Sequence, residues 1–223
     1  MSERKLQAAR KAVEFVQDGM VLGLGTGSTT RLAVDEIGKL VKDGYQLVGI
    51  PTSVETEKQA RSLGIPLTTL DQVDQIDLTI DGADEVDPHF RLIKGLGGAL
   101  LREKIVAYHS KREIIIVDDS KMVQILGIKT PLPVEVVQFS HLRTKRAIEA
   151  LGCVATLRGG TNPFITDNGN VIYDCKFKEI NEPERLESGL NSIPGVVENG
   201  LFLGLATCVV VGTERGTIVK EKD

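Results

Sequence analysis

The chain is poor in cysteine, in long apolar runs and in excess positive charge, and each shortage argues against a class of protein. Its three cysteines, Cys153, Cys175 and Cys208, are widely spaced and form no C-x-x-C pair, which excludes a disulfide framework and argues against a zinc site. No apolar run approaches the roughly 20 residues that a membrane span needs. The formal net charge of −4 argues against a nucleic-acid-binding surface, because phosphate contacts require clustered lysine and arginine. We therefore expect no membrane and no nucleic acid among the partners.

The three histidines, His89, His109 and His141, show no ligand spacing either, so no metal is expected. What the chain does contain is typical of a soluble globular protein: 223 residues, of which 41% are hydrophobic and 26% are charged. That length suffices for one large or two small domains with a sizeable core. The N-terminal segment reads as a charged amphipathic helix without the apolar centre of a signal peptide, so the expected location is the cytoplasm.

Up to about residue 118, short apolar runs alternate with segments of helical periodicity. A helix over 4–17 precedes an apolar strand and a glycine-rich turn in MVLGLGTGSTT, and later strands end in polar residues, as in YQLVGIPTS and REIIIVDDS. The segment IPLTTL (65–70) also has the composition of a strand. Strands that alternate with helices predict a parallel, doubly wound sheet.

The pattern changes near Gly127. The residues that follow read as a strand, a helix and antiparallel strands, and Asp167-Asn168-Gly169 is a strong hairpin signal, because asparagine and glycine tolerate the positive φ of a tight turn. An apolar strand of the first kind returns at 206–213. We therefore predict an α/β protein with a Rossmann-like, mostly parallel sheet and a second, smaller α+β domain inserted before the last strand. The expected domains are residues 1–127 plus 205–223, and residues 128–204.

The glycine-rich turn GLGTGSTT follows a strand and opens a helix, so its backbone N–H groups and the helix dipole suit an anion. A P-loop would need a lysine where Gly27 is followed by Ser28 and Thr29. A dinucleotide fingerprint would need a third glycine and an acidic residue at the end of the second strand, which ends in Pro51-Thr52-Ser53. Two interpretations remain: a plain glycine turn, or a small site that takes one phosphate through Thr26, Gly27, Ser28 and Thr29.

The stretch IDGADEVDPHFRLIKGLGGALLREK (80–104) combines many charges with apolar runs. The spacing of its first acids does not match an EF-hand calcium loop. We interpret Glu85 and Asp87 as part of a solvated turn. Asp81 and Asp84 instead flank the end of a strand and two small residues, at the sheet edge where open α/β proteins bind ligands.

Lys94 and Glu103 complete the charged set of this stretch. Lys94 precedes a glycine-rich helix start, where its charge and the backbone N–H groups together suit an oxyanion. Glu103 lies about one turn into the following helix. A carboxylate base, a lysine and two hydrogen-bonding aspartates suit proton transfer beside a carbonyl. Surface Lys and Glu on an amphipathic helix explain the same pair equally well.

Six segments occur in an order and spacing that resemble the type A ribose-5-phosphate isomerases: GLGTGSTT, IDGADEVD, LIKGLGGALLREKIVA, DDSKMV, PFITDNGNVIYD and IPGVVENGLFLG. The resemblance covers almost the whole chain, and the set is specific although each segment alone is weak. It implies an aldose-ketose isomerase that interconverts D-ribose 5-phosphate and D-ribulose 5-phosphate through an enediolate, in the non-oxidative branch of the pentose phosphate pathway. It also implies that the enzyme needs no metal or cofactor and forms a homodimer or a homotetramer.

The resemblance assigns roles to single residues. Glu103 would be the base that moves a proton between carbons 1 and 2, and Lys94 would stabilise the enediolate oxygen. Asp81 would assist ring opening and hydroxyl proton transfer, and Asp84 would hold the sugar hydroxyls. The implied substrate-binding residues are Thr26, Gly27, Ser28, Thr29, Asp81, Gly82, Ala83, Asp84, Lys94, Gly95, Leu96, Gly97, Lys121 and Lys5.

One position departs from the family pattern, in which Lys-Gly-Gly-Gly is usual and Leu96 stands here inside the run. A leucine with φ above zero would be strained by about 1 kcal/mol or more. We therefore predict an ordinary backbone conformation at Leu96. The same departure weakens the case for a substrate contact through the Leu96 amide.

Other classes of function remain as alternatives. A non-catalytic sugar-phosphate sensor would share the phosphate turn, but it would usually carry a DNA-binding module, and the sequence offers no spare helix-turn-helix segment or basic patch. A related sugar-phosphate or acyl-CoA enzyme would not need the full set of Asp81, Asp84, Lys94 and Glu103. A dehydrogenase is disfavoured because the dinucleotide fingerprint is missing.

Overall fold

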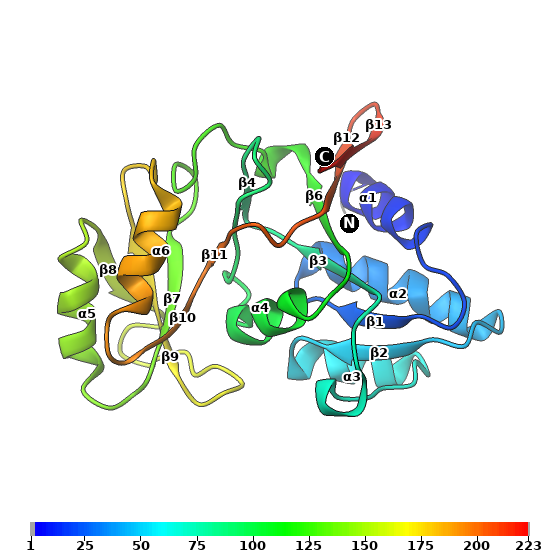
Figure 1. Ribbon diagram of the computed structural model, residues 1–223, viewed down its shortest axis with the longest axis horizontal. Coiled ribbons are helices and arrows are strands. Elements are labelled where there is room, and N and C mark those ends of the chain that lie inside the picture. Colours follow the sequence, from blue (N-terminus) through cyan, green and yellow to red (C-terminus); the bar gives the residue numbers. More distant parts are fainter. Residues whose placement is uncertain (1–2, 223) are drawn as a thin grey trace. The chain divides into compact units, whose positions relative to one another are not determined.

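The computed structural model describes residues 3–222 (Figure 1), which form two compact units. The first unit comprises the described residues up to Ala83, Arg102–Lys121 and the described residues from Gly204 onward. The second comprises Asp84–Leu101 and Met122–Leu203. The division expected from the sequence stays a prediction, and the compact units differ from it mainly by grouping residues 84–101 with the second unit.

The first unit is built on a six-stranded sheet in the order β13-β12-β6-β3-β1-β2, which is parallel except for β13 at one edge. Near-continuous apolar strands such as EIIIVD are typical of a sheet that is buried on both faces. The predicted α/β class with a mostly parallel sheet is confirmed. The strands are β1 (Val21–Leu24), β2 (Val48–Pro51), β3 (Leu78–Gly82), β6 (Glu113–Asp118), β12 (Cys208–Thr213) and β13 (Gly216–Glu221).

Helices pack on this sheet through two separate cores. Residues of α1 and α2, among them Ala8 and Ile37, share one core with β1, β3, β6 and β12. Val106 of α4 packs with Ile50 and Ile76 in the other. The helices are α1 (Glu3–Val13), α2 (Ser28–Lys42), α3 (Val54–Ser62) and α4 (Leu100–Tyr108), with short 3₁₀ helices η1 (Leu70–Gln72) and η2 (Asp119–Lys121).

Two sequence-based boundaries are corrected. The first helix ends at Val13 rather than at residue 17. The strand expected over 65–70 is reduced to one bridge between Leu67 and Gly49, because Pro66 has no N–H to donate to a sheet ladder and the chain turns into η1 directly afterwards.

The second unit contains two small antiparallel sheets, in the orders β10-β7-β9-β8 and β11-β5-β4. Its core joins Val134 and Tyr173 of the larger sheet to Ile148 of α5 and Leu190 of α6. The hairpin signal is confirmed, since Ile165 bridges to Val171 across the turn. The elements are β4 (Glu85–Val86), β5 (Leu92–Ile93), β7 (Leu132–Val136), α5 (His141–Glu149), β8 (Val154–Leu157), β9 (Val171–Lys176), α6 (Pro183–Asn191), β10 (Val196–Asn199) and β11 (Leu201–Phe202).

The order of the strands in the first unit creates a switch point beside β1. The chain passes from β1 to β2 on one side of β1, and then to β3 on the other side. The carboxyl ends of β1 and β3 therefore lie side by side, where open α/β sheets bind ligands. Within residues 3–222, no helix is long and apolar enough to cross a bilayer.

Candidate active site

The turn after β1 is held against Asp81 at the end of β3. The Thr26 N–H donates a hydrogen bond to Asp81 Oδ1 at 3.1 Å, and the Gly82 N–H donates to the same oxygen at 2.7 Å. A Cβ atom on Gly25 would lie only 2.2 Å from that oxygen, so a close approach of turn and carboxylate requires glycine at this position. The first glycine-rich motif and the acidic motif thus meet in one place.

The side chain of Thr26 joins a cluster of hydroxyl groups. Its Oγ1 lies 2.7 Å from that of Thr52, 2.8 Å from Oγ of Ser53 and 3.2 Å from Oγ1 of Thr56. The Thr52 and Thr56 hydroxyls also donate to main-chain carbonyls at the end of β1 and in the turn. Sequence reasoning missed these three residues as part of the site. The available signal for Thr52 and Ser53 was the polar end of YQLVGIPTS, whereas Thr56 lies in the helix that follows.

The first turn of α2 offers its N–H groups to an anion. Gly27 is the N-cap, with φ of 117°, and it provides no side-chain acceptor for them. The Lys5 Nζ donates to Ser28 Oγ at 3.0 Å, which brings a positive charge to this turn. Thr29 is buried in the first turn of the helix. Lys5, Ser28 and Thr29 therefore lie together at the start of α2, where free helix N–H groups suit an anion.

Lys121 reaches the same edge of the sheet from η2. Burial pushes the pKa of the Asp118 carboxyl up, but hydrogen bonds from Ser120 and the charges of Lys5 and Lys121 outweigh it, so the pKa lies below its ordinary value. Lys5, predicted as a phosphate contact, and Lys121, predicted as a substrate-binding lysine, thus both lie near one carboxylate at the end of β6.

Glu103 and Lys94 are both buried. Glu103 of α4 is 4% exposed and Lys94 is 2% exposed. The Lys94 N–H donates to the Gly200 carbonyl at 2.9 Å, and its Nζ lies 5.3 Å from the centre of the Phe202 ring. Burial of a charged group is costly, so the alternative that this pair belongs to a solvated helix surface is wrong.

In the loop after Lys94, the backbone N–H of Leu96 already has a hydrogen-bond partner within the protein. The Leu96 N–H donates to Asp84 Oδ2 at 3.0 Å. Among the described residues other than glycine, only Phe90 and Ser140 have positive φ, so the predicted ordinary backbone at Leu96 is confirmed. The Leu96 N–H therefore orients Asp84.

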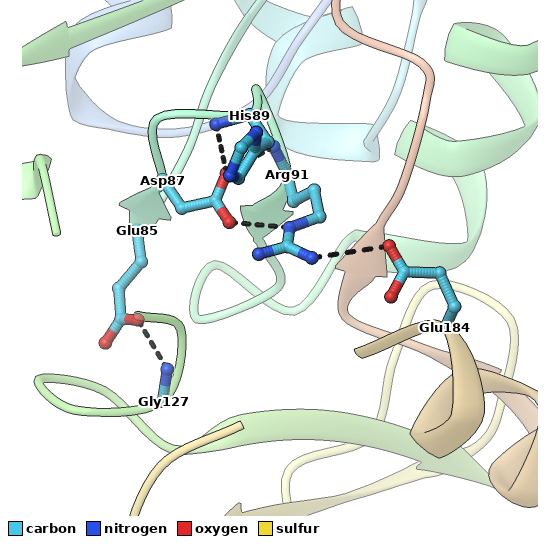
Figure 2. A network of polar contacts seen from close by, with 6 residues as sticks. All are labelled: Glu85, Asp87, His89, Arg91, Gly127 and Glu184. Atoms are coloured by element: carbon cyan, nitrogen blue, oxygen red, sulfur yellow. Dashed lines mark hydrogen bonds and ion pairs between the residues drawn. The ribbon is translucent and has the colours of Figure 1, made fainter. Parts of the chain in front are cut away.

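Glu85 and Asp87 are not part of a solvated turn, which corrects the interpretation from the sequence (Figure 2). Glu85 accepts hydrogen bonds from the N–H groups of Gly127, Lys129 and Thr130. Asp87 accepts from the N–H groups of His89 and Arg91 and from the Arg91 guanidinium, which also contacts Glu184. Both carboxylates are buried because they satisfy backbone donors within the second unit.

The predicted site residues divide between the two units. Contacts within the first unit bring together the glycine-rich turn, Lys5, Lys121 and Asp81. Contacts within the second unit join Asp84 to Leu96. No group of three or more His, Cys, Asp or Glu among residues 3–222 is arranged to hold a metal ion. The first unit carries Lys5, Thr26, Gly27, Ser28, Thr29, Asp81, Gly82, Ala83, Glu103 and Lys121, and the second carries Asp84, Lys94, Gly95, Leu96 and Gly97.

Comparison with known proteins agrees with the motifs. Residues 48–216 match the family described as Ribose 5-phosphate isomerase A (phosphoriboisomerase A). The chain is 52% identical to ribose-5-phosphate isomerase A of Parvibaculum lavamentivorans, with 98% of both chains covered, and 54% identical to that of Gloeobacter violaceus, with 95% of this chain and 93% of the relative covered. A solved D-ribose-5-phosphate isomerase in complex with phospho-erythronic acid superposes with a TM-score of 0.96 at 44% identity, covering all of both chains. The chain belongs to the ribose 5-phosphate isomerase A family.

Proposed function

We propose that the protein interconverts D-ribose 5-phosphate and D-ribulose 5-phosphate, as an aldose-ketose isomerase of the non-oxidative pentose phosphate pathway. The observation that carries the proposal is the hydrogen bond between the Thr26 N–H and Asp81. It sets an anion-binding turn beside a carboxylate that can handle hydroxyl protons, which is what a phosphorylated polyol requires. Membership of the family over nearly the whole chain supports the same substrate.

In the proposed mechanism the phosphate binds at Thr26–Thr29, with Lys5 and Lys121 contributing charge. Asp81 assists ring opening and then moves the hydroxyl proton from O2 to O1. Glu103 removes the proton from C2 of the open aldose and returns it to C1. Because the carbon acid is weak, most of the barrier must be lowered by stabilising the enediolate rather than by the base alone.

Lys94 serves that stabilisation, and Asp84 holds the hydroxyls of the chain. Burial of Lys94 strengthens its attraction to an oxyanion, since the local dielectric is low. The solved relative in complex with phospho-erythronic acid supports an enediolate intermediate, because the carboxylate of that acid is planar and anionic as an enediolate is. In this proposal Lys5 and Lys121 stabilise the phosphate of the substrate, and Lys94 stabilises its enediolate oxygen.

The first experiment measures conversion of ribose 5-phosphate by the purified protein with a chelator present. Turnover with chelator supports the isomerase and a mechanism without a metal. Binding of the phosphosugar without turnover would favour the sensor, and loss of turnover with chelator alone would show a metal requirement.

Glu103→Gln keeps the shape of the side chain but removes the base. We expect turnover to fall by at least about a hundredfold, the usual contribution of general base catalysis. Glu55→Gln, at an exposed position of α3, is the matched control and should leave turnover unchanged. Near-normal turnover of Glu103→Gln would remove this residue from the mechanism.

We also propose that the protein acts in the cytoplasm as a homodimer or a homotetramer. Phe139 (86% exposed), Val154 (67%) and Leu142 (61%) leave apolar surface on the second unit that a second copy could cover. Sedimentation equilibrium measures the assembly, and a monomer at micromolar concentration would contradict it.

A further inference from the structure

Hydrogen bonds hold several polar backbone groups of the loop from Gly95 to Gly98. The Gly98 N–H donates to the Gly95 carbonyl at 3.0 Å, which closes a tight turn, and the Leu96 N–H is held by Asp84. Gly95 and Gly98 both have positive φ, at 104° and 83°. The turn is therefore closed by its own hydrogen bonds, and the carbonyls of Gly95 and Leu96 also have a partner outside it.

Both carbonyls are bound by one side chain from elsewhere in the second unit. Arg158 Nη1 donates to the Gly95 carbonyl at 3.0 Å and to the Leu96 carbonyl at 3.1 Å. Its Nε and Nη2 form a bidentate pair with the two carboxylate oxygens of Asp174 on β9. The fixed fork of a guanidinium can meet both demands at once, which an ammonium cannot.

Phe164 completes this clamp from the same hairpin. The Phe164 N–H donates to the Arg158 carbonyl at 3.0 Å, and its ring centre lies 5.8 Å from the guanidinium carbon. A Cβ atom on Gly98 would lie 2.5 Å from the tip of the Phe164 ring. The ring therefore packs directly on the turn, and only glycine fits beneath it.

Arg158 and Phe164 together fix the direction of the peptide group between Leu96 and Gly97. No cis peptide bond occurs among residues 3–222, so the Leu96 carbonyl and the Gly97 N–H point in opposite directions. Because Arg158 holds the carbonyl, the N–H is turned away from Arg158. The cation also polarises the peptide and makes that N–H a stronger donor.

We infer that Arg158 is a positioning residue for the reaction: it holds the loop so that the Gly97 N–H donates to the developing enediolate oxygen beside Lys94. The inference rests on the proposed isomerase function and deepens it. A donor aimed at charge that develops in the transition state lowers the barrier without tightening ground-state binding. Arg158 acts through the backbone and does not touch the substrate.

The test is steady-state kinetics of Arg158→Met with ribose 5-phosphate. We expect kcat to fall at least tenfold with KM within about threefold of wild type, because the phosphate ligands are unaltered. The inhibition constant for phospho-erythronic acid should rise at least fivefold, whereas inhibition by inorganic phosphate should not change. Arg91→Met, which removes another partly buried guanidinium paired with a carboxylate in this unit, should lose stability and keep kcat.

Arg158→Lys covers the case in which Arg158→Met fails to fold. It keeps a cation beside Asp174 but cannot also hold both carbonyls, so we expect an unfolding midpoint near that of wild type and kcat still reduced at least fivefold. Full kcat in Arg158→Lys, or in a folded Arg158→Met, would overturn this inference but not the proposed function. So would a rise in KM at unchanged kcat. An inactive wild-type protein would overturn the proposed function, and the inference with it.

Discussion

At the scale of single residues, the acidic loop contains a carboxylate that acts on the backbone. Glu85 is fully buried, and the N–H groups of Gly127, Lys129 and Thr130 donate to it at 2.6–2.8 Å. The Thr130 hydroxyl adds a fourth bond at 3.1 Å. These bonds tie residues 127–130 to β4, which begins directly after Asp84. The position of Asp84 therefore depends on its neighbour.

Glu85→Gln should destabilise the protein by about 2–4 kcal/mol, because an amide NH₂ would face N–H donors and leave buried groups unpaired. Urea unfolding at neutral pH measures the change. Glu184→Gln alters a carboxylate that is 65% exposed, and it should shift the free energy of unfolding by less than about 1 kcal/mol. Equal effects of the two substitutions would contradict the assigned role of Glu85.

Sequence reasoning succeeded at residues whose local chemistry is decisive. The conformation of Leu96 followed from the steric cost of positive φ, and that prediction is confirmed. Glu85 was interpreted wrongly because its backbone donors, at Gly127 to Thr130, lie far along the chain and only the fold brings them close. Asp87 was interpreted wrongly because its partners, although only two and four residues away, meet it only in a specific turn. A carboxylate looks the same in sequence whether water or amides solvate it.

At the scale of elements, Asp77 connects the starts of three strands. It precedes β3, accepts a hydrogen bond from the Val21 N–H of β1 at 2.9 Å, and pairs at 2.8 Å with Lys111, just before β6. The hydrogen bond from Lys111 and that from Val21 hold the pKa of Asp77 below its ordinary value of 3.8. The ionised form is therefore favoured in the folded state.

Asp77→Asn should cost about 1 kcal/mol at pH 7, since the side chain is 29% exposed and its ion pair is partly screened. A depressed pKa stabilises the fold above the unfolded pKa, and that contribution is lost as the pH falls through the folded pKa. The difference from wild type should thus shrink below about pH 4. Urea unfolding across pH 2.5–7 measures it.

Asp74→Asn is the control for this series, because Asp74 is an exposed acid three residues earlier. Its free energy of unfolding should follow that of wild type at every pH. A difference between Asp77→Asn and wild type that stays constant down to pH 2.5 would show that the charge of Asp77 contributes nothing.

The order of the elements was more predictable than their edges. Apolar runs such as EIIIVD identify buried parallel strands because both faces must be covered. The segment 65–70 has a similar composition, yet it forms a single bridge at the edge of β2, where Pro66 cannot extend the ladder. Composition does not reveal whether a free sheet edge is available.

At the scale of the whole molecule, the first unit is assembled from distant parts of the chain. β12 lies between β6 and β13, and five of its six residues are buried. Cys208 and Val210 belong to the core that also holds α1 and α2. The return of the chain at 206–213 was predictable because this strand repeats the apolar character of the earlier ones. The neighbours of β12 in the sheet were not predictable, because the pairing of strands depends on the whole fold.

A chain that ends at Leu203 should therefore lose the cooperative unfolding of the first unit. It would lack β12, leaving β6 as a new edge and opening the core around Val210 to water. A chain that ends at Thr213 loses only β13, an edge strand with half of its residues exposed, and should stay folded with reduced stability. Urea unfolding followed by circular dichroism compares the two. If the chain ending at Leu203 unfolded in one transition near the midpoint of the full chain, β12 would not be part of the cooperative core.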